Sequence, residues 1–155
     1  MTTDPTDLYI QLLKDDNQPE LDKFYNQSPL QQVNFNKVYQ AIHTVENNSS
    51  VYNALGLYYY GMGNEFDDVK SFYYWIKAGD NIHAKDNLNA LMTFRSRYSD
   101  DNPEHVDFLK SIKPMIEKLI KLEVENQQLI DENTHLKYMP SAGYQEAQDH
   151  FESLQ

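Results

Sequence analysis

The chain of 155 residues contains no cysteine, which excludes disulfides, thiol catalysis and thiolate metal sites. Basic residues are also scarce: 13 Lys and Arg stand against 24 Asp and Glu, for a net charge of -11. Such a chain has no positive field to attract phosphate or anionic lipid, so we expect neither nucleic acid nor a membrane as partner. No stretch approaches the roughly 18 apolar residues of a membrane span. The start lacks the pattern of a secretory signal, so we expect a cytoplasmic protein.

Composition and periodicity indicate one helical domain with appendages. Hydrophobic residues form 40% of the chain and aromatic residues 13%, which is more apolar surface than a disordered acidic chain carries. Every long segment with a clear period has helical spacing and none alternates as a strand would, so the predicted fold class is all-α. Short helices are expected after Pro5, after Pro19 and over residues 32–45, with a break at Asn47-Asn48-Ser49-Ser50. The apolar positions of the first helix are Leu8, Leu12 and Leu13.

The chain also resembles itself at a lag of about 33 residues. The aligned pairs are Ile42 with Trp75, Val45 with Ala78, Asn48 with Asn81, Val51 with Ala84, Leu55 with Leu88 and Tyr59 with Met92. A helix-turn-helix unit cannot bury its own apolar face, so a period of this length is typical of stacked helical repeats. One unit comprises a helix over residues 51–60, a turn over 61–65, and a second helix that Asp67 caps and Gly79 ends. Asn81 can cap the following helix.

One run of residues in this unit carries a family resemblance. The run is Ala54-Leu55-Gly56-Leu57-Tyr58-Tyr59-Tyr60-Gly61-Met62-Gly63, followed by Asp67, Lys70, Tyr73-Tyr74-Trp75, Lys77-Ala78-Gly79, Ala84 and Asn87-Leu88. Over about residues 35–95 it resembles a Sel1-like repeat, a relative of tetratricopeptide repeats. The chain departs from the family pattern in a shorter turn, a Trp displaced by one position, Ser71 in place of Ala, and Gly79 in place of a second Ala. The resemblance implies a scaffold fold over residues 1–100 that binds proteins or peptides on its concave face.

Side-chain size agrees with this resemblance. Gly56 and Ala78 would let neighbouring helices approach closely, and Tyr59 and Trp75 would fill the space between them. We predict a partner groove whose lining residues are Tyr58, Tyr60, Tyr73 and Trp75. The aromatic clusters lack the interleaved basic residues of base-stacking sites, so they favour helix packing and protein contact over nucleic acid binding.

A seven-residue apolar pattern begins at Ile112 and continues for about three and a half heptads. The a positions are Ile112, Leu119, Asn126 and Asn133, and the d positions are Met115, Leu122, Leu129 and Leu136. This pattern predicts a coiled-coil helix over residues 103–139, which begins at Asn102-Pro103 and which Pro140 ends. Pro114 should kink or restart the helix.

The predicted seam favours a parallel homodimer. Asn126 and Asn133 at a positions pair best with their own copies across a parallel two-stranded seam. The flanking pairs Lys118 with Glu123 and Glu132 with Lys137 would attract, while Glu125 would face the apolar Ile130. The alternative is a helix that packs on its own repeat domain. A second stripe of Ile116, Ile120 and Val124 indicates contact with that domain up to about Val124.

For the final segment, residues 140–155, the spacing of apolar residues predicts a short amphipathic tail. It is either a recognition peptide or a segment that folds back on the coil or frays. From Lys137-Tyr138-Met139-Pro140 onward, the end of the chain is similar to the ends of repeat proteins encoded by large DNA viruses of amoebae. That similarity implies the host cytoplasm or a virus particle as the location.

Groups that could perform catalysis do not converge in any motif. The five histidines are single and lack metal-ligand spacing, and Gly61-Met62-Gly63 lacks the further Gly and the Lys of a phosphate-binding loop. We therefore expect no enzyme, no cofactor and no metal site. The leading hypothesis is a protein–protein interaction scaffold that dimerises through its coiled coil. The alternatives are a structural component of a larger assembly such as a virus particle and, third, an enzyme.

Overall fold

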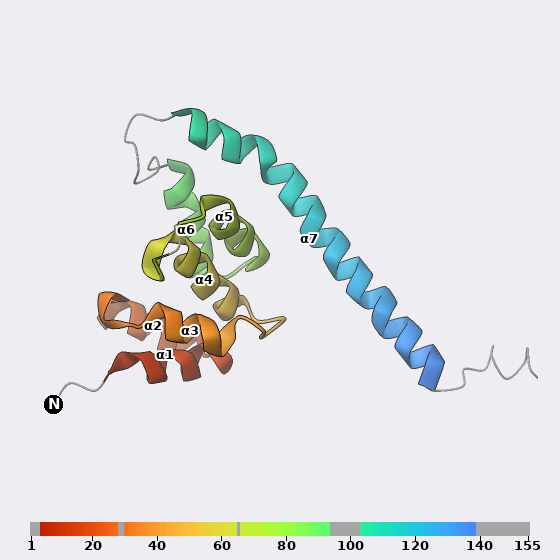
Figure 1. Cartoon of the computed structure of the whole chain (residues 1–155), viewed down its shortest axis with the longest axis horizontal. Helices are drawn as coiled ribbons and strands as arrows, with labels where there is room; N and C mark the ends of the chain where they lie inside the picture. The colour runs from red at the N-terminus through yellow and green to blue at the C-terminus, as the bar shows by residue number, and fades with distance from the viewer. Residues whose placement is uncertain (1–3, 28–29, 65, 94–102, 139–155) are drawn as a thin grey trace, which may run out of the picture. The chain divides into compact units, whose positions relative to one another are not determined.

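The computed structural model describes residues 4–27, 30–64, 66–93 and 103–138, and all regular structure in those ranges is helical (Figure 1). Its elements are α1 (Pro5–Lys14), α2 (Gln18–Gln27), the 3-10 helix η1 (Leu30–Gln32), α3 (Phe35–Ile42), α4 (Ser49–Leu57), the π-helical turn η2 (Tyr58–Met62), α5 (Asp68–Lys77), α6 (Ile82–Thr93) and α7 (Pro103–Tyr138). The all-α prediction is confirmed for these residues. The tail predicted over 140–155 lies outside them.

The chain divides into two compact units, Met1–Glu117 and Lys118–Gln155. The boundary falls inside α7. The first unit contains α1 to α6 and the beginning of α7, and the second contains the rest of α7.

The first six helices follow one another as three helix-turn-helix pairs with recurring caps. The second helix of each pair begins after an asparagine, which is Asn17, Asn48 or Asn81. The side-chain oxygens of these residues accept hydrogen bonds from the backbone N–H groups of Glu20 at 3.3 Å, Val51 at 3.0 Å and Ala84 at 3.1 Å. Each bond satisfies a helix N–H that has no partner within the helix. The prediction that Asn81 caps a helix is confirmed, and its aligned counterpart Asn48 does the same.

The turn inside each pair contains one residue with positive φ. These residues are Asp16 at 49°, Asn47 at 57° and Gly79 at 62°. Left-handed backbone ends a helix, and Gly, Asn and Asp adopt it at the lowest cost. The predicted stop at Gly79 is confirmed. So is the predicted start of α5, where the Asp67 side chain accepts from the Lys70 N–H at 3.0 Å.

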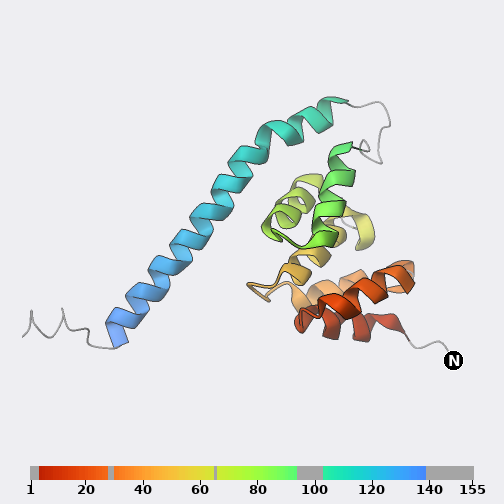
Figure 2. The same cartoon turned by 180° about the vertical axis from the view of Figure 1, so that it is seen from behind.

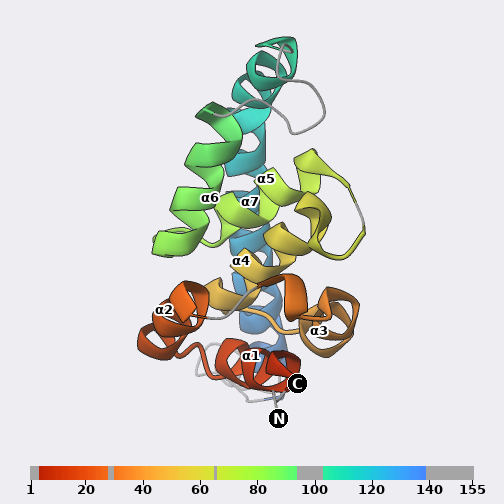
Figure 3. The same cartoon turned by 90° about the vertical axis from the view of Figure 1, so that its left-hand side faces the viewer.

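Helix α4 occupies the centre of the first unit, and residues 50–57 are buried throughout. Helix α1 packs against α2, α3 and α4, while α4 packs against α5 and α6. In Figures 1 and 3, α4 lies between the layer of α1 to α3 and the pair α5 and α6. The α-helix ends at Leu57, before the predicted Tyr60, because the chain passes into the π-helical turn and then bends at Gly61, whose φ is 118°.

The buried face of α1 differs by one residue from the predicted one. Leu8 is exposed, and Tyr9 is fully buried together with Leu13. Burial of Tyr9 is possible because its hydroxyl is hydrogen-bonded to the Tyr25 hydroxyl at 2.8 Å, so no polar atom loses its partner.

Helix α7 is continuous from Pro103 to Tyr138, as its ribbon shows in Figures 1 and 2. Of the two effects expected of Pro114, a kink or a restart, the restart does not occur, because Pro114 lies inside one helix. A proline removes one backbone hydrogen bond and crowds one preceding carbonyl, which is a local cost of about 3 kcal/mol that a long helix can absorb. Leu109 and Ile116, on the part of α7 that belongs to the first unit, are buried.

Candidate functional site

The residues of the predicted seam form an exposed row along α7. Ile112 is half-buried, and the exposed members are Met115, Leu119, Leu122, Asn126, Leu129, Asn133 and Leu136. Met115 is 70% exposed and Leu129 57% exposed, although neither residue gains from contact with water. A row of large apolar side chains at heptad spacing is typical of a surface that pairs with another helix.

The buried residues of α7 lie on a different flank from this row. Leu109 and Ile116 are seven residues apart, and each directly follows a d position of the heptad. Phe108, one heptad before Met115, occupies the other d position and is 50% exposed. The burial of the e flank therefore leaves the a and d positions from Met115 to Leu136 exposed, while Ile112 is half-buried. Phe108 extends the row by one position that the sequence pattern does not predict, because it lies before Ile112, the first residue of the predicted seam.

Half-exposed tyrosines form a second surface, here called the tyrosine face, across α3, η2 and α5. Its members are Tyr39, Tyr58, Tyr59, Tyr73 and Tyr74. The ring centroids of Tyr39 and Tyr58 are 4.4 Å apart in a stacked pair, and those of Tyr59 and Tyr74 are 5.8 Å apart with an interplanar angle of 1°. Tyr73 meets Tyr74 edge-on at 5.1 Å. Such contacts fix the rings in place, which lowers the entropy that a tyrosine loses when a partner binds.

Two lysines of α5 cover rings of this cluster. The Lys70 Nζ lies 4.9 Å from the Tyr59 ring centroid, and the Lys77 Nζ lies 5.4 Å from that of Tyr73. Loss of water around the Tyr59 hydroxyl, together with its tyrosine neighbours, raises the pKa of Tyr59 above its usual value. The face is therefore neutral at its tyrosines and positive at its edge, in a chain whose net charge is negative.

The four residues predicted to line a partner groove divide between surface and core. Tyr58 and Tyr73 belong to the tyrosine face, and Tyr60 lies with its ring centroid 5.6 Å from that of Trp75. Trp75 is only 2% exposed, and its indole N–H donates to the backbone oxygen of Asn53 at 3.2 Å. The assignment of Trp75 to an accessible groove is wrong, because the indole fills the space between α4 and α5.

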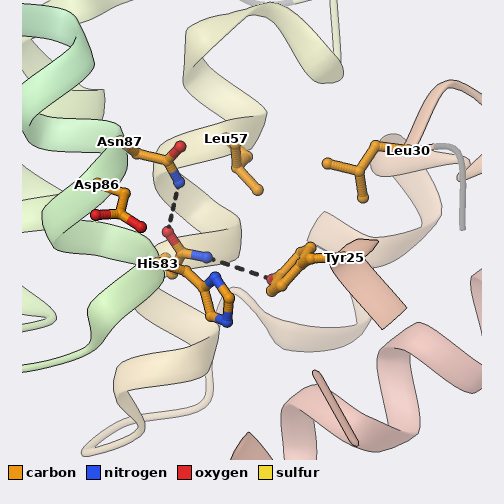
Figure 4. A pocket seen from close by; sticks show the side chains of 7 residues that line it. Tyr25, Leu30, Leu57, His83, Asp86 and Asn87 are labelled. Carbon is orange, nitrogen blue, oxygen red and sulfur yellow. Dashed lines mark hydrogen bonds between the residues drawn. The ribbon is translucent and has the colours of Figure 1, made fainter. Parts of the chain in front are cut away.

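A pocket of about 260 Å³ opens in the first unit, away from these four residues (Figure 4). Its lining residues are Tyr25, Leu30, Asn53, Leu57, His83, Asp86 and Asn87. They come from α2, η1, α4 and α6, so the pocket depends on contacts between residues far apart in the sequence. No sequence motif marks it.

A chain of hydrogen bonds forms the floor of this pocket. The Asn87 amide donates to the Asn53 Oδ1 at 2.9 Å, and the Asn53 amide donates to the Tyr25 hydroxyl at 3.3 Å (Figure 4). Loss of water around the phenol raises the pKa of Tyr25 to about 12, in spite of the bonds from Tyr9 and Asn53, which lower it. The His83 ring lies against Tyr25 in a tilted contact, with centroids 4.6 Å apart and an interplanar angle of 57°, and its Nε2 bonds to an Asp22 carboxylate oxygen.

Comparison with family models, curated proteins and solved structures finds no match. Within the described ranges, no helix is both long and apolar enough to cross a bilayer. The same ranges contain no group of three or more potential His or acidic metal ligands.

Proposed function

We propose that the protein is a non-enzymatic interaction scaffold that forms a parallel homodimer through α7. The observation that carries this proposal is the exposed row of apolar a and d positions from Met115 to Leu136. Burial of such a row in a second copy would remove several large apolar side chains from water, at roughly 25 cal/mol per Å². If α7 stayed unpaired in a monomer, these side chains would remain in water and this free energy would not be gained.

The polar members of the row favour two parallel strands. Asn126 and Asn133 are both exposed, seven residues apart, and both occupy a positions. In a parallel dimer in register each amide faces its own copy and can form a hydrogen bond with it. A shift by one heptad keeps only one Asn126–Asn133 pair and places the other Asn126 against Leu119, so it costs an unpaired buried amide. The two asparagines thus lower the stability of the seam while they select its register.

We further propose that the three helix pairs are repeats of the Sel1-like type. Support comes from the recurring caps Asn48 and Asn81 and from the close approach of α4 and α5 at Gly56. In this proposal the tyrosine face supplies the surface that holds a partner, and the coiled coil doubles its valency. Two linked weak sites bind more tightly than either alone by a factor on the order of 100, when both can engage at once.

The dimer is tested by the double substitution of Leu129→Glu and Leu136→Glu, with light scattering over a range of concentrations. We expect a dimer mass for the wild type and a monomer mass for the variant, because four carboxylates would meet in each buried seam. The matched control is Gln128→Glu with His135→Glu. These two exposed c positions have the same spacing and receive the same two carboxylates, on the outer side of the helix.

Equal masses for the wild type and the seam variant at every concentration would refute the homodimer. A wild-type mass that grows without limit as concentration rises would instead favour the larger-assembly alternative. Loss of the dimer in the control as well would mean that charge on α7, and not the seam, decides association.

Partner binding at the tyrosine face has its own test. Tyr73→Ser should keep the dimer mass and the helical circular dichroism while it reduces the capture of a partner in a pull-down. Val69→Ala is the control, since Val69 is exposed on the same helix and does not belong to the tyrosine face. Equal capture of the partner by the wild type, Tyr73→Ser and Val69→Ala would refute this role of the tyrosine face.

A further inference from the structure

We propose that the pocket between α2, α4 and α6 binds a lysine side chain presented by a protein partner. The inference deepens the scaffold function by naming the chemistry of the partner. It uses different residues from the seam of α7, so the two proposals can fail separately.

The pocket has one apolar wall and one polar wall. Figure 4 shows Leu57 and Leu30 on one side, and Asp86, Asn87 and His83 around the other. A ligand that fits both walls has an aliphatic part for the leucines and a polar end for the acceptors. Lysine has this form, with a four-carbon stem and an ammonium group that donates three hydrogen bonds.

The polar wall presents acceptors and negative charge. The Asn87 amide N–H donates to Asn53, which leaves the Asn87 carbonyl oxygen as an acceptor. The carboxylate of Asp86 adds a negative charge from the next position in the chain. No Lys or Arg is among the lining residues, and the Nε2 of His83, the lining residue that can carry a positive charge, is already bonded to the carboxylate of Asp22. A cation is the complementary ligand.

The hydrogen-bond chain holds the wall in one arrangement. Asn53 is 1% exposed, and both ends of its side-chain amide are used, by Asn87 and by Tyr25. Because rotation of the Asn53 amide would break both bonds, Asn87 is fixed in the orientation that offers its oxygen. A preformed acceptor lowers the ordering cost of binding.

The volume limits what can enter. A space of about 260 Å³ lies below the 300 to 1,000 Å³ typical of pockets for drug-sized ligands, and it suits a single long side chain. Side-chain capture at such a site gives a weak contact by itself, which a dimeric scaffold would strengthen by presenting two copies.

The test is a titration followed by nuclear magnetic resonance, in the wild type and in the Leu129→Glu, Leu136→Glu variant. The probes are Nα-acetyl-lysine N-methylamide, its neutral counterpart Nα-acetyl-norleucine N-methylamide, and n-pentylamine. We expect saturable shifts of the Asn53 and Asn87 side-chain amides with capped lysine, and none with capped norleucine. The same shifts should appear in the wild type and in the seam variant, because the seam residues are not part of the pocket.

Asp86→Asn should weaken the binding of capped lysine roughly tenfold, since it removes the charge and keeps the shape. Asp80→Asn is the matched control, because Asp80 is fully exposed, lies outside the pocket and loses the same charge. An equal effect of both substitutions would overturn the site in favour of diffuse attraction to an acidic protein. Saturation by norleucine would overturn the choice of a cation, and tighter binding of pentylamine than of capped lysine would replace the protein partner with a free amine.

Discussion

The indole of Trp75 occupies the space that a side chain at Gly56 would need. A Cβ added to Gly56 would lie 2.2 Å from the Trp75 Nε1, well inside any real contact distance. The contact is fixed on both sides, because the indole N–H is bonded to Asn53 and the Ser71 hydroxyl donates to the Gly56 backbone oxygen at 2.9 Å. Helices α4 and α5 can therefore pack this closely only with glycine at position 56.

Gly56→Ala should lower the free energy of unfolding by about 1 to 3 kcal/mol, because the indole must move within a packed core. Gly79→Ala provides the comparison: nothing lies within 4 Å of an added Cβ there, but φ is +62°. That substitution should cost only the left-handed backbone penalty of about 1 kcal/mol. Urea unfolding measures both substitutions, and a smaller loss of stability for Gly56→Ala than for Gly79→Ala would contradict the packing argument.

The free energy of unfolding should also fall at alkaline pH, because the hydrogen-bonded pair Tyr9 and Tyr25 is buried. In the unfolded chain a tyrosine side chain has a pKa near 10. Burial raises the pKa of Tyr9 well above that value, and the pKa of Tyr25 rises to about 12. Between pH 10 and 12 the unfolded state thus loses protons that the folded state keeps. The stabilisation is complete below pH 10 and is lost as the pH rises, by about 2 to 3 kcal/mol for Tyr25 alone.

Urea unfolding at pH 9 and pH 11.5 measures this loss. Tyr25→Phe removes one ionisable group, so the variant should be less stable at pH 9 but should lose less stability over the same interval. A variant with the same alkaline loss as the wild type would show that Tyr25 ionises normally in the folded protein.

The helix ends could be predicted from the sequence because capping is local. Asp67 and Asn81 accept from N–H groups two or three residues away, and the left-handed backbone at Gly79 depends on that residue alone. Gly56 was predicted as a point of close approach on the same principle, since small size at one position is visible in the sequence. The heptad row of α7 is likewise a property of spacing within a single helix.

The pocket could not be predicted, because it depends on residues 28 to 61 positions apart. Asn53 bonds to Tyr25 and Asn87, and His83 bonds to Asp22. Nothing local distinguishes Asn53 from the polar residues of a solvated helix face. Trp75 illustrates the same limit, since its spacing places it on the apolar side of α5 and does not tell whether the ring meets a partner or another helix.

Replacement of a seam asparagine should strengthen association and weaken the preference for a dimer over a trimer. Asn126→Ile exchanges a buried amide for a β-branched apolar side chain at an a position, which stabilises association but also admits trimers. Sedimentation equilibrium should show tighter association and a fraction above the dimer mass. Gln128→Ile adds the same side chain at an exposed c position and should change neither quantity. An unchanged dissociation constant for Asn126→Ile would mean that Asn126 is not in the seam.

Substitutions at two adjacent residues of α7, Phe108 and Leu109, should affect different properties, namely dimerisation and the folding stability of the monomer. Leu109 is fully buried, so Leu109→Ala should lower the free energy of unfolding by about 2 to 5 kcal/mol, the range for truncation in a core. Phe108 is 50% exposed at a d position, so Phe108→Ala should leave the unfolding of the monomer within about 0.5 kcal/mol of the parent. The expected effect of Phe108→Ala is a weaker dimer, because the seam then loses a side chain at its first d position.

Both substitutions can be separated from association by making them in the Leu129→Glu, Leu136→Glu background. Urea unfolding in that background reports the monomer, and light scattering of the single variants reports the dimer. Large destabilisation by Phe108→Ala in the monomer would place Phe108 in the core of the first unit. The seam would then begin at Ile112, where the sequence placed it, because a side chain already held by its own domain cannot also face a second helix.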